Sequence, residues 1–154
     1  MDIKQIVDKY GDMLFRVCLA QLRSRFDAED VVQDVFVKLI CDGSGEELDS
    51  EHLKARLIRT AVNRCHDLRR REKYRATEEL YDECAAEELS SEQTELFDAL
   101  YNLPERFRVA VSLYYIEGYS VKEIAGIVKS TESAVKMRLK KGRELLRVLL
   151  EEEK

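Results

Sequence analysis

The chain has 154 residues, enough for one ordinary domain or two small ones. Charged residues make up 37% of it, tryptophan is absent, and there are only six glycines and one proline. So few helix breakers predict an all-α protein. No apolar run approaches the roughly 20 residues of a membrane helix, and the N-terminus lacks a signal peptide's apolar core, so no membrane insertion is expected.

Charge is distributed in blocks along the chain, although the formal net charge is only −5. Residues 51–75 hold nine bases and three acids, a net charge of +6, whereas residues 76–98 hold nine acids and no base. Such asymmetry is more informative than the total. It predicts two anion-binding surfaces separated by an acidic segment.

Two amphipathic helices are predicted at the start of the chain, the first over residues 2–25 and the second from Asp27, its expected N-cap. The opposite face of the second helix carries Asp30, Gln33 and Asp34. This polar face is either solvated or a docking face for a basic partner. The expected buried stripe of the second helix is Ala28, Val31, Val32, Val35, Phe36, Leu39 and Ile40.

A third helix is predicted from Ser50 to about Tyr74, after a loop at residues 41–49. Its C-terminal end is strongly basic. Cations favour the C-terminal end of a helix dipole, but the dipole requires only one or two. The excess of bases therefore indicates that this helix end binds a polyanion, and the alternative is a helix end that is simply solvated. The bases are Arg69, Arg70, Arg71, Lys73 and Arg75.

Residues 76–92 are acidic and hold few large apolar side chains, which predicts a flexible linker between two small helical domains, residues 1–75 and 93–154. The four cysteines are far apart and form no CxxC pair. We interpret them as reduced structural thiols of a cytoplasmic protein, with neither a metal nor a cofactor.

The second domain is expected to begin with a helix that ends before Pro104, which suits the first turn of the next helix. That helix is expected to bury Phe107, Ala110, Val111 and Tyr114, and to end at a C′ glycine, Gly118.

Residues 120–143 predict a helix-turn-helix. Ser120 and Glu123 form a capping box at its start, and Ser130 or Thr131 can cap a second, basic helix. Residues 129–147 carry seven bases against two acids. A helix-turn-helix places the start of its second helix in the DNA major groove, although a hairpin with a solvated basic face would show a similar pattern.

Three blocks of the chain together resemble the small two-domain bacterial sigma factors of the extracytoplasmic-function (ECF) group. The first is DAEDVVQDVFVKL, the second LKARLIRTAVNRCHDLRRR, and the third runs from Leu103 to Leu150. In this family the first block binds the clamp helices of the β′ subunit of core RNA polymerase. The second recognises and melts the −10 promoter element, and the third binds the −35 element.

The resemblance implies a role for each candidate residue. Asp30, Gln33 and Asp34 would contact the polymerase. Asn63 would approach the promoter strand, and Arg69, Arg70, Arg71 and Lys73 would hold phosphates. Thr131, Glu132, Ser133 and Lys136 are candidates for base edges, and Arg138, Lys140, Lys141 and Arg143 for phosphates. In relatives the loop before the third helix captures unpaired bases; here it has no aromatic residue, which leaves a backbone-lined pocket as the alternative.

Several residues depart from the family pattern, namely Leu53, Arg56, Lys129, Ser130, Met137 and Gly142, and two of them predict local changes. Lys129 stands at a turn position often held by glycine, so a reshaped turn is expected. Gly142 lies inside the basic helix, where glycine destabilises by about 1 kcal/mol relative to alanine.

The leading interpretation is thus a sigma factor that performs no covalent chemistry and directs core polymerase to promoter DNA. An anti-sigma protein restrains many relatives, although the sequence identifies none here. The first alternative is a helix-turn-helix regulator that does not join polymerase, which would have no need of the Asp30–Asp34 face. An interaction protein that binds polymerase but not promoters is another. An enzyme is disfavoured, because no phosphate loop or metal-ligand spacing is present.

Overall fold

The computed structural model describes residues 2–43, 49–74 and 91–152, and these ranges contain helices but no strand. The all-α prediction is thereby confirmed. The acidic residues 76–90 and the centre of the loop at residues 44–48 lie outside the described residues. The helices are α1 (Ile3–Leu22), α2 (Arg25–Asp42), α3 (Ser50–Tyr74), α5 (Ser91–Tyr101), α6 (Glu105–Val111), the π-helix η1 (Ser112–Ile116), α7 (Val121–Val128) and α8 (Glu132–Glu152).

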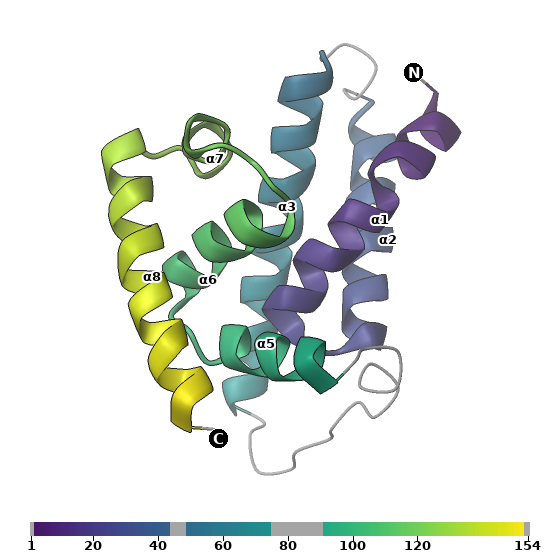
Figure 1. Cartoon of the computed structure of the whole chain (residues 1–154). Helices are drawn as coiled ribbons and strands as arrows, with labels where there is room; N and C mark the ends of the chain where they lie inside the picture. Colours follow the sequence, from purple (N-terminus) through teal and green to yellow (C-terminus); the bar gives the residue numbers. More distant parts are fainter. Residues whose placement is uncertain (1, 44–48, 75–90, 153–154) are drawn as a thin grey trace.

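Helices α1, α2 and α3 form the N-terminal half and pack against one another along their apolar stripes (Figure 1). The start of α2 differs from the prediction. Ser24 is the N-cap, and its Oγ accepts a hydrogen bond from the Asp27 amide at 3.2 Å. Asp27 therefore lies in the first turn, because Arg23 adopts a left-handed conformation (φ 58°) that ends α1 at Leu22, three residues earlier than expected. The loop at 41–49 also begins later, since α2 continues to Asp42.

Helices α5, α6, η1, α7 and α8 form the C-terminal half. The helix α5 begins at Ser91, so the last two residues of the predicted linker are helical. Pro104 directly precedes α6 as its N-cap, one residue before the first turn in which it was expected. The helix α6 continues into η1, and Gly118 (φ 75°) follows its end, as the sequence predicts. Tyr114 is exposed rather than buried, because the π-turn rotates it away from the core.

Gly142 lies where α8 crosses α6 at close range. A Cβ at this position would stand 2.6 Å from Cγ2 of Val111 and 3.4 Å from Cβ of Phe107. The glycine thus permits the close approach of α6 and α8, which offsets its low helix propensity.

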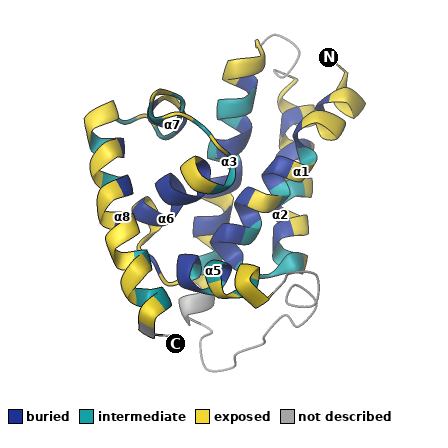
Figure 2. Cartoon of the chain, viewed as in Figure 1, coloured by how far each residue is buried: buried dark blue, intermediate teal, exposed yellow. Residues whose placement is uncertain are grey.

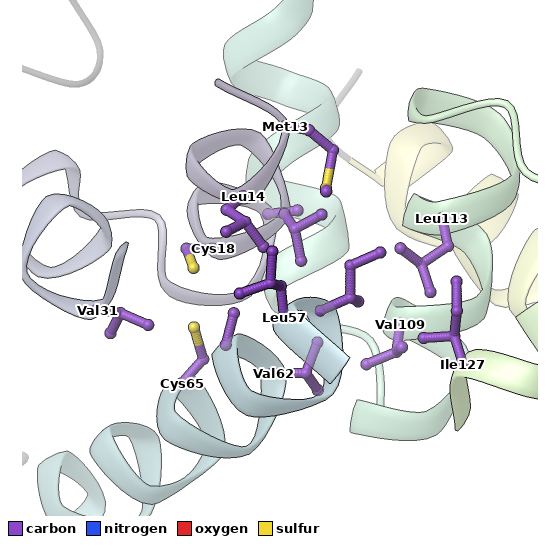
Figure 3. Close-up of a cluster of buried hydrophobic side chains, with 14 of the residues drawn as sticks. Met13, Leu14, Cys18, Val31, Leu57, Val62, Cys65, Val109, Leu113 and Ile127 are labelled. Atoms are coloured by element: carbon purple, nitrogen blue, oxygen red, sulfur yellow. The ribbon is translucent and has the colours of Figure 1, made fainter. Parts of the chain in front are cut away.

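The two halves pack together around one continuous core. The sequence left this arrangement open. Figure 2 shows buried residues concentrated where α1, α3 and α6 meet, while the outer side of α8 is exposed. Close to this point, Met13, Leu57 and Val62 lie in the same cluster as Val109, Leu113 and Ile127 (Figure 3). The candidate surfaces therefore project outward from a shared apolar centre.

Candidate polymerase and nucleic-acid interfaces

The outward face of α2 presents the three predicted polymerase-binding side chains together. Asp30, Gln33 and Asp34 are all exposed, because the apolar stripe on the opposite side of α2 packs against α1 and α3. Arg64 of α3 donates to Oδ2 of Asp34 from Nε and Nη2, at 3.3 and 3.1 Å, and both side chains are about half exposed. Asp34 is thus partly neutralised within the chain, whereas Asp30 faces solvent.

Three apolar side chains extend this face beyond what the sequence reasoning identified. Phe26, Val37 and Ile40 are 62%, 57% and 58% exposed. At 100° per residue they lie on the same side of α2 as Asp30 and Gln33. The prediction that Ile40 is buried was wrong, since the stripe that packs consists of Ala28, Val31, Val35, Phe36 and Leu39. The presence of apolar residues on both sides of α2 was the sequence signal that could have predicted this exposed apolar surface.

On α3, Asn63, Asp67, Arg70 and Arg71 form one exposed face, with Arg70 Nη1 3.4 Å from Asp67 Oδ1. The Lys73 side chain lies outside the described ones. This face combines an amide with two unburied guanidinium groups, which suits contact with a nucleic-acid strand and its phosphates.

Arg69 differs from its neighbours, because it points toward the C-terminal half. Its Nη1 and Nη2 donate to the backbone carbonyls of Gln21 and Tyr101 at 2.9 and 3.0 Å, and its guanidinium lies 4.0 Å from the Tyr101 ring centroid. A guanidinium committed to these contacts is not presented to phosphates, so the structure does not support the expected role of Arg69 in this arrangement.

The helix-turn-helix of α7 and α8 is ordered by local hydrogen bonds. Ser120 and Glu123 form the predicted capping box. Lys129 adopts the left-handed conformation (φ 55°, ψ 52°) that glycine often supplies, and its amide bonds to the Ala125 carbonyl. The turn is therefore closed by Lys129 itself and is not reshaped as expected. Of the two candidate caps, Thr131 accepts from the Ala134 amide at 3.0 Å.

The first turns of α8 are presented to solvent. Thr131, Glu132, Ser133 and Lys136 are exposed, while Val135 and Leu139 hold the helix against the core. Further along, Lys140, Lys141 and Arg143 are exposed and Arg138 is half-buried. Arg143 also donates from Nη1 to the Tyr115 hydroxyl at 3.1 Å. Apart from the half-buried Arg138, the predicted base-edge and phosphate groups are thus exposed, on α8 and on the cap residue that precedes it.

The cysteines and histidines form no metal-ligating group in the described part of the chain. Cys18 and Cys65 are buried beside each other, and their hydrogen bond, together with burial, raises the pKa of Cys65. Cys41 is exposed, and Cys84 lies outside the described residues. None of the helices described in residues 2–152 could cross a bilayer by its length and apolarity.

His66 is buried between the halves, and its Nδ1 meets the carboxylate of Glu105. Burial, followed by the charges of Arg108, Arg70 and Arg69, lowers its pKa to about 4. The contact with Glu105 is therefore a hydrogen bond from a neutral imidazole at pH 7, rather than an ion pair.

Comparison with known proteins connects these surfaces to one family. The models for Sigma-70 region 2 and Sigma-70 region 4 match residues 6–75 and 93–146. The ECF RNA polymerase sigma factor SigE of Mycolicibacterium smegmatis is 31% identical over 93% of this chain, which spans only 59% of that relative. SigW of Bacillus subtilis is 28% identical over 92% of this chain and 85% of SigW. The ECF RNA polymerase sigma-E factor of Haemophilus influenzae is 32% identical over 83% of this chain and 77% of that protein.

Solved structures share the fold. The sigma factor RpoE of Bartonella quintana, crystallised with the anti-sigma factor NepR, superposes with a TM-score of 0.74 at 22% identity, covering 96% of both chains. CnrH, solved in complex with the cytosolic domain of CnrY, gives a TM-score of 0.75 at 25% identity, covering 99% of this chain and 89% of CnrH.

Proposed function

The chain belongs to the extracytoplasmic-function group of RNA polymerase sigma factors, which direct transcription initiation at specific promoters, and we propose how its surfaces divide that task. Residues 1–75 bind core polymerase and the −10 element, residues 93–154 bind the −35 element, and residues 76–92 join the two units. The protein acts in the cytoplasm as a dissociable subunit and performs no covalent chemistry.

The observation that carries the polymerase-binding role is the outward face of α2. Its exposed apolar side chains, Phe26, Val37 and Ile40, alternate with the acids Asp30 and Asp34. Three large apolar groups exposed together on one helix face are not expected if that face contacts only solvent. Acidic side chains are not expected on a surface that binds DNA, because they repel its phosphates. A partner helix with apolar and basic side chains fits both, and we assign the clamp helices of the β′ subunit to this face.

The DNA contacts divide into positioning and reading groups. Arg70 and Arg71 on α3, together with Lys73, hold phosphates beside Asn63, while Arg69 is left out because it joins the two halves. On α8, the exposed Thr131, Glu132, Ser133 and Lys136 meet base edges, and Arg138, Lys140, Lys141 and Arg143 meet phosphates or support the helix. Because RpoE was crystallised with an anti-sigma factor and CnrH was solved in complex with the cytosolic domain of CnrY, an anti-sigma partner is part of the proposal.

The test is co-elution of the chain with sigma-free core RNA polymerase on a sizing column. Asp30→Arg combined with Asp34→Arg should abolish co-elution, because like charges would then face the basic partner. Asp8→Arg combined with Asp12→Arg is the matched control, since it reverses two exposed acids at the same spacing on α1.

Wild type and the α1 control should both co-elute. Co-elution of the α2 variant, or its loss in the α1 control, would contradict the assignment of the α2 face. Failure of wild type to co-elute while it still binds duplex DNA would instead favour a helix-turn-helix regulator.

A further inference from the structure

The second turn of α8 carries one large apolar side chain on its solvent side. Met137 is 49% exposed, and in the described part of the chain it belongs neither to the hydrophobic core nor to the apolar side chains packed against it. The α8 residues that do pack there are Val135, Leu139, Leu146 and Leu149. Burial therefore does not account for a large apolar group at position 137.

The geometry of the helix points Met137 directly away from the core. At 100° per residue, it lies about 160° from Val135 on one side and about 160° from Leu139 on the other. Its neighbours on the helix surface, three or four positions away, are the exposed Ser133, Lys140 and Lys141. Met137 therefore stands near the centre of the outer side of α8, which is exposed (Figure 2).

The direction of helical side chains brings Met137 toward the N-terminal end of α8. Side chains on a helix tilt toward its N-terminus and cover the preceding turn, which here holds Ser133. In a helix-turn-helix, the N-terminal residues of the second helix are the ones that contact base edges in the major groove. Met137 is thus placed to share that groove with Glu132, Ser133 and Lys136.

Met137 is an isolated apolar group among basic side chains. The bases exposed within about one turn of it are Lys136, Lys140 and Lys141. The next exposed apolar side chains along α8, Leu145 and Val148, stand about 12 and 16 Å further along the helix axis. One apolar group is too small to form the apolar centre of a protein interface. Bases that hold phosphates on either side of a groove instead leave the group between them facing the base pairs.

Thymine is the base that offers an apolar group in the major groove. It presents its C5-methyl there, whereas the other bases present hydrogen-bond donors and acceptors. The thioether of methionine is flexible and polarisable, donates no hydrogen bond and accepts only weakly. Met137 therefore gains contact area from a thymine methyl and little from the polar edges of the other bases.

We propose that Met137 reads a thymine methyl group in the −35 element. The inference rests on the proposed function, because it requires α8 to enter the major groove of that element. It adds a preference that Glu132 and Lys136 do not supply, since a carboxylate and an ammonium recognise donors and acceptors. One base pair of the element is then specified as thymine by apolar contact.

The test measures how tightly the reconstituted holoenzyme binds duplexes in which single thymines are replaced by deoxyuridine, which lacks the C5-methyl and keeps the base pairing. The starting duplex is selected from a library randomised over the −35 element, by core polymerase carrying the wild-type chain. Met137→Ala removes the apolar contact, and Met137→Leu keeps an apolar side chain of similar volume. The matched control is Val148→Ala, because Val148 is equally exposed on the same side of α8 but three turns further along.

For wild type, one deoxyuridine replacement should weaken binding about 3- to 5-fold, as for the loss of contact with one methyl group. Met137→Ala should bind the thymine duplex about as weakly as wild type binds the deoxyuridine duplex, and it should not distinguish the two. Met137→Leu and Val148→Ala should keep the wild-type difference. All three variants should co-elute with core polymerase, because both positions lie on α8 and not on the α2 face.

A selected −35 element without thymine, a wild type that binds every deoxyuridine duplex unchanged, or a Met137→Ala variant that still prefers thymine would each overturn the role of Met137. Loss of the preference in Val148→Ala would overturn it as well, because the preference would then not depend on position 137. Loss of co-elution in Met137→Ala would assign this side chain to a polymerase contact instead.

Failure of the inference is distinguishable from failure of the proposed function. A wild type that joins polymerase and selects duplexes without any methyl dependence leaves the sigma-factor assignment intact and overturns only the reading by Met137. A wild type that does not join polymerase fails the co-elution test itself, and both proposals then fail.

Discussion

The charges on the outer face of α2 and those between the two halves are alike in sequence and opposite in setting. Asp30 and Asp34 lie in solvent beside exposed apolar groups, whereas Glu117 is nearly buried under Arg16. Both sets stand on amphipathic helices with ordinary spacing. The difference lies in their partners: Asp30 faces solvent and Asp34 is paired only with the half-exposed Arg64, whereas Glu117 is bonded to Arg16, 101 positions away.

This contrast shows that a charged helix face predicts a binding partner. It does not show whether that partner is another molecule or a distant segment of the same chain. Arg69 and Arg71 show it within three residues, since one is bonded to Gln21 and Tyr101 and the other is exposed. Substitutions at one buried and one exposed member of such a pair should therefore distinguish effects on folding stability from effects on binding.

The largest effect is expected at Arg108. Its guanidinium donates to Gln21 Oε1 and to the Leu103 carbonyl, and burial, followed by the charge of Arg69, lowers its pKa to about 10, so it remains charged at pH 7. Arg108→Met leaves two buried acceptors unsatisfied and should lower the free energy of unfolding by about 3 kcal/mol. Arg106→Met, on the exposed side of the same helix, should change it by less than about 0.5 kcal/mol.

Urea unfolding at pH 7 measures both Arg108→Met and Arg106→Met. Equal free energies for the two variants would mean that the buried contact between α1 and α6 contributes no stability.

A second effect, of about 2 kcal/mol, is expected at His66 on changing pH. The folded-state pKa of about 4 lies below the ordinary 6.5, so the unfolded chain binds protons more readily between these values. The contribution of neutral His66 to the free energy of unfolding is therefore fully present above about pH 6.5, and it is lost as the pH falls toward 4. Between pH 7 and 5 the loss amounts to about 2 kcal/mol.

Urea unfolding of His66→Gln at both pH values should show that this part of the pH dependence is gone. His52→Gln is the control, because His52 is exposed on the same helix, and it should keep the wild-type pH dependence. Identical pH profiles for His66→Gln and wild type would show that His66 does not titrate as described.

Much of the fold follows from local signals in the sequence. The periodicity of α3, the capping box at Ser120 and the left-handed Gly118 each depend on residues within a few positions, and the structure confirms them. Where two local signals competed, the sequence did not decide: Ser24 rather than Asp27 caps α2, because the preceding turn closes at Arg23.

What the sequence could not provide depends on contacts between distant segments. From the sequence, Gly142 is a helix-destabilising residue, and only the close packing of α6 explains it. Likewise, Arg69 is one more candidate phosphate-binding base in the sequence, and only the structure shows that its guanidinium lies over the Tyr101 ring. The exposed side chains of Phe26 and Ile40 were missed for the same reason, since only the packing of α2 shows which apolar residues remain outside.

Arg69 and Arg71 provide a third test with opposite readouts. Arg69→Gln should lower the free energy of unfolding by about 1–2 kcal/mol, because it loses charged hydrogen bonds to Gln21 and Tyr101. Arg71→Gln should leave stability unchanged and reduce the slope of log K against log salt for duplex DNA by about 1. Fluorescence anisotropy over a salt series gives the slope, and urea unfolding gives the stability. A reduced slope for Arg69→Gln with unchanged stability would return Arg69 to the phosphate-binding set.

The smallest effect on stability is expected at the exposed pair of Asp34 and Arg64. Because both side chains are about half exposed, Asp34→Asn and Arg64→Gln should each change the free energy of unfolding by less than about 0.5 kcal/mol. Their effects on polymerase binding should have opposite signs. Asp34→Asn removes a charge that the partner uses and should weaken binding by about 3- to 5-fold, whereas Arg64→Gln frees Asp34 from an internal competitor and should strengthen it. Titration of labelled chain with core polymerase measures both, and equal weakening by the two variants would mean that the Asp34–Arg64 pair, rather than the free carboxylate, is what the polymerase recognises.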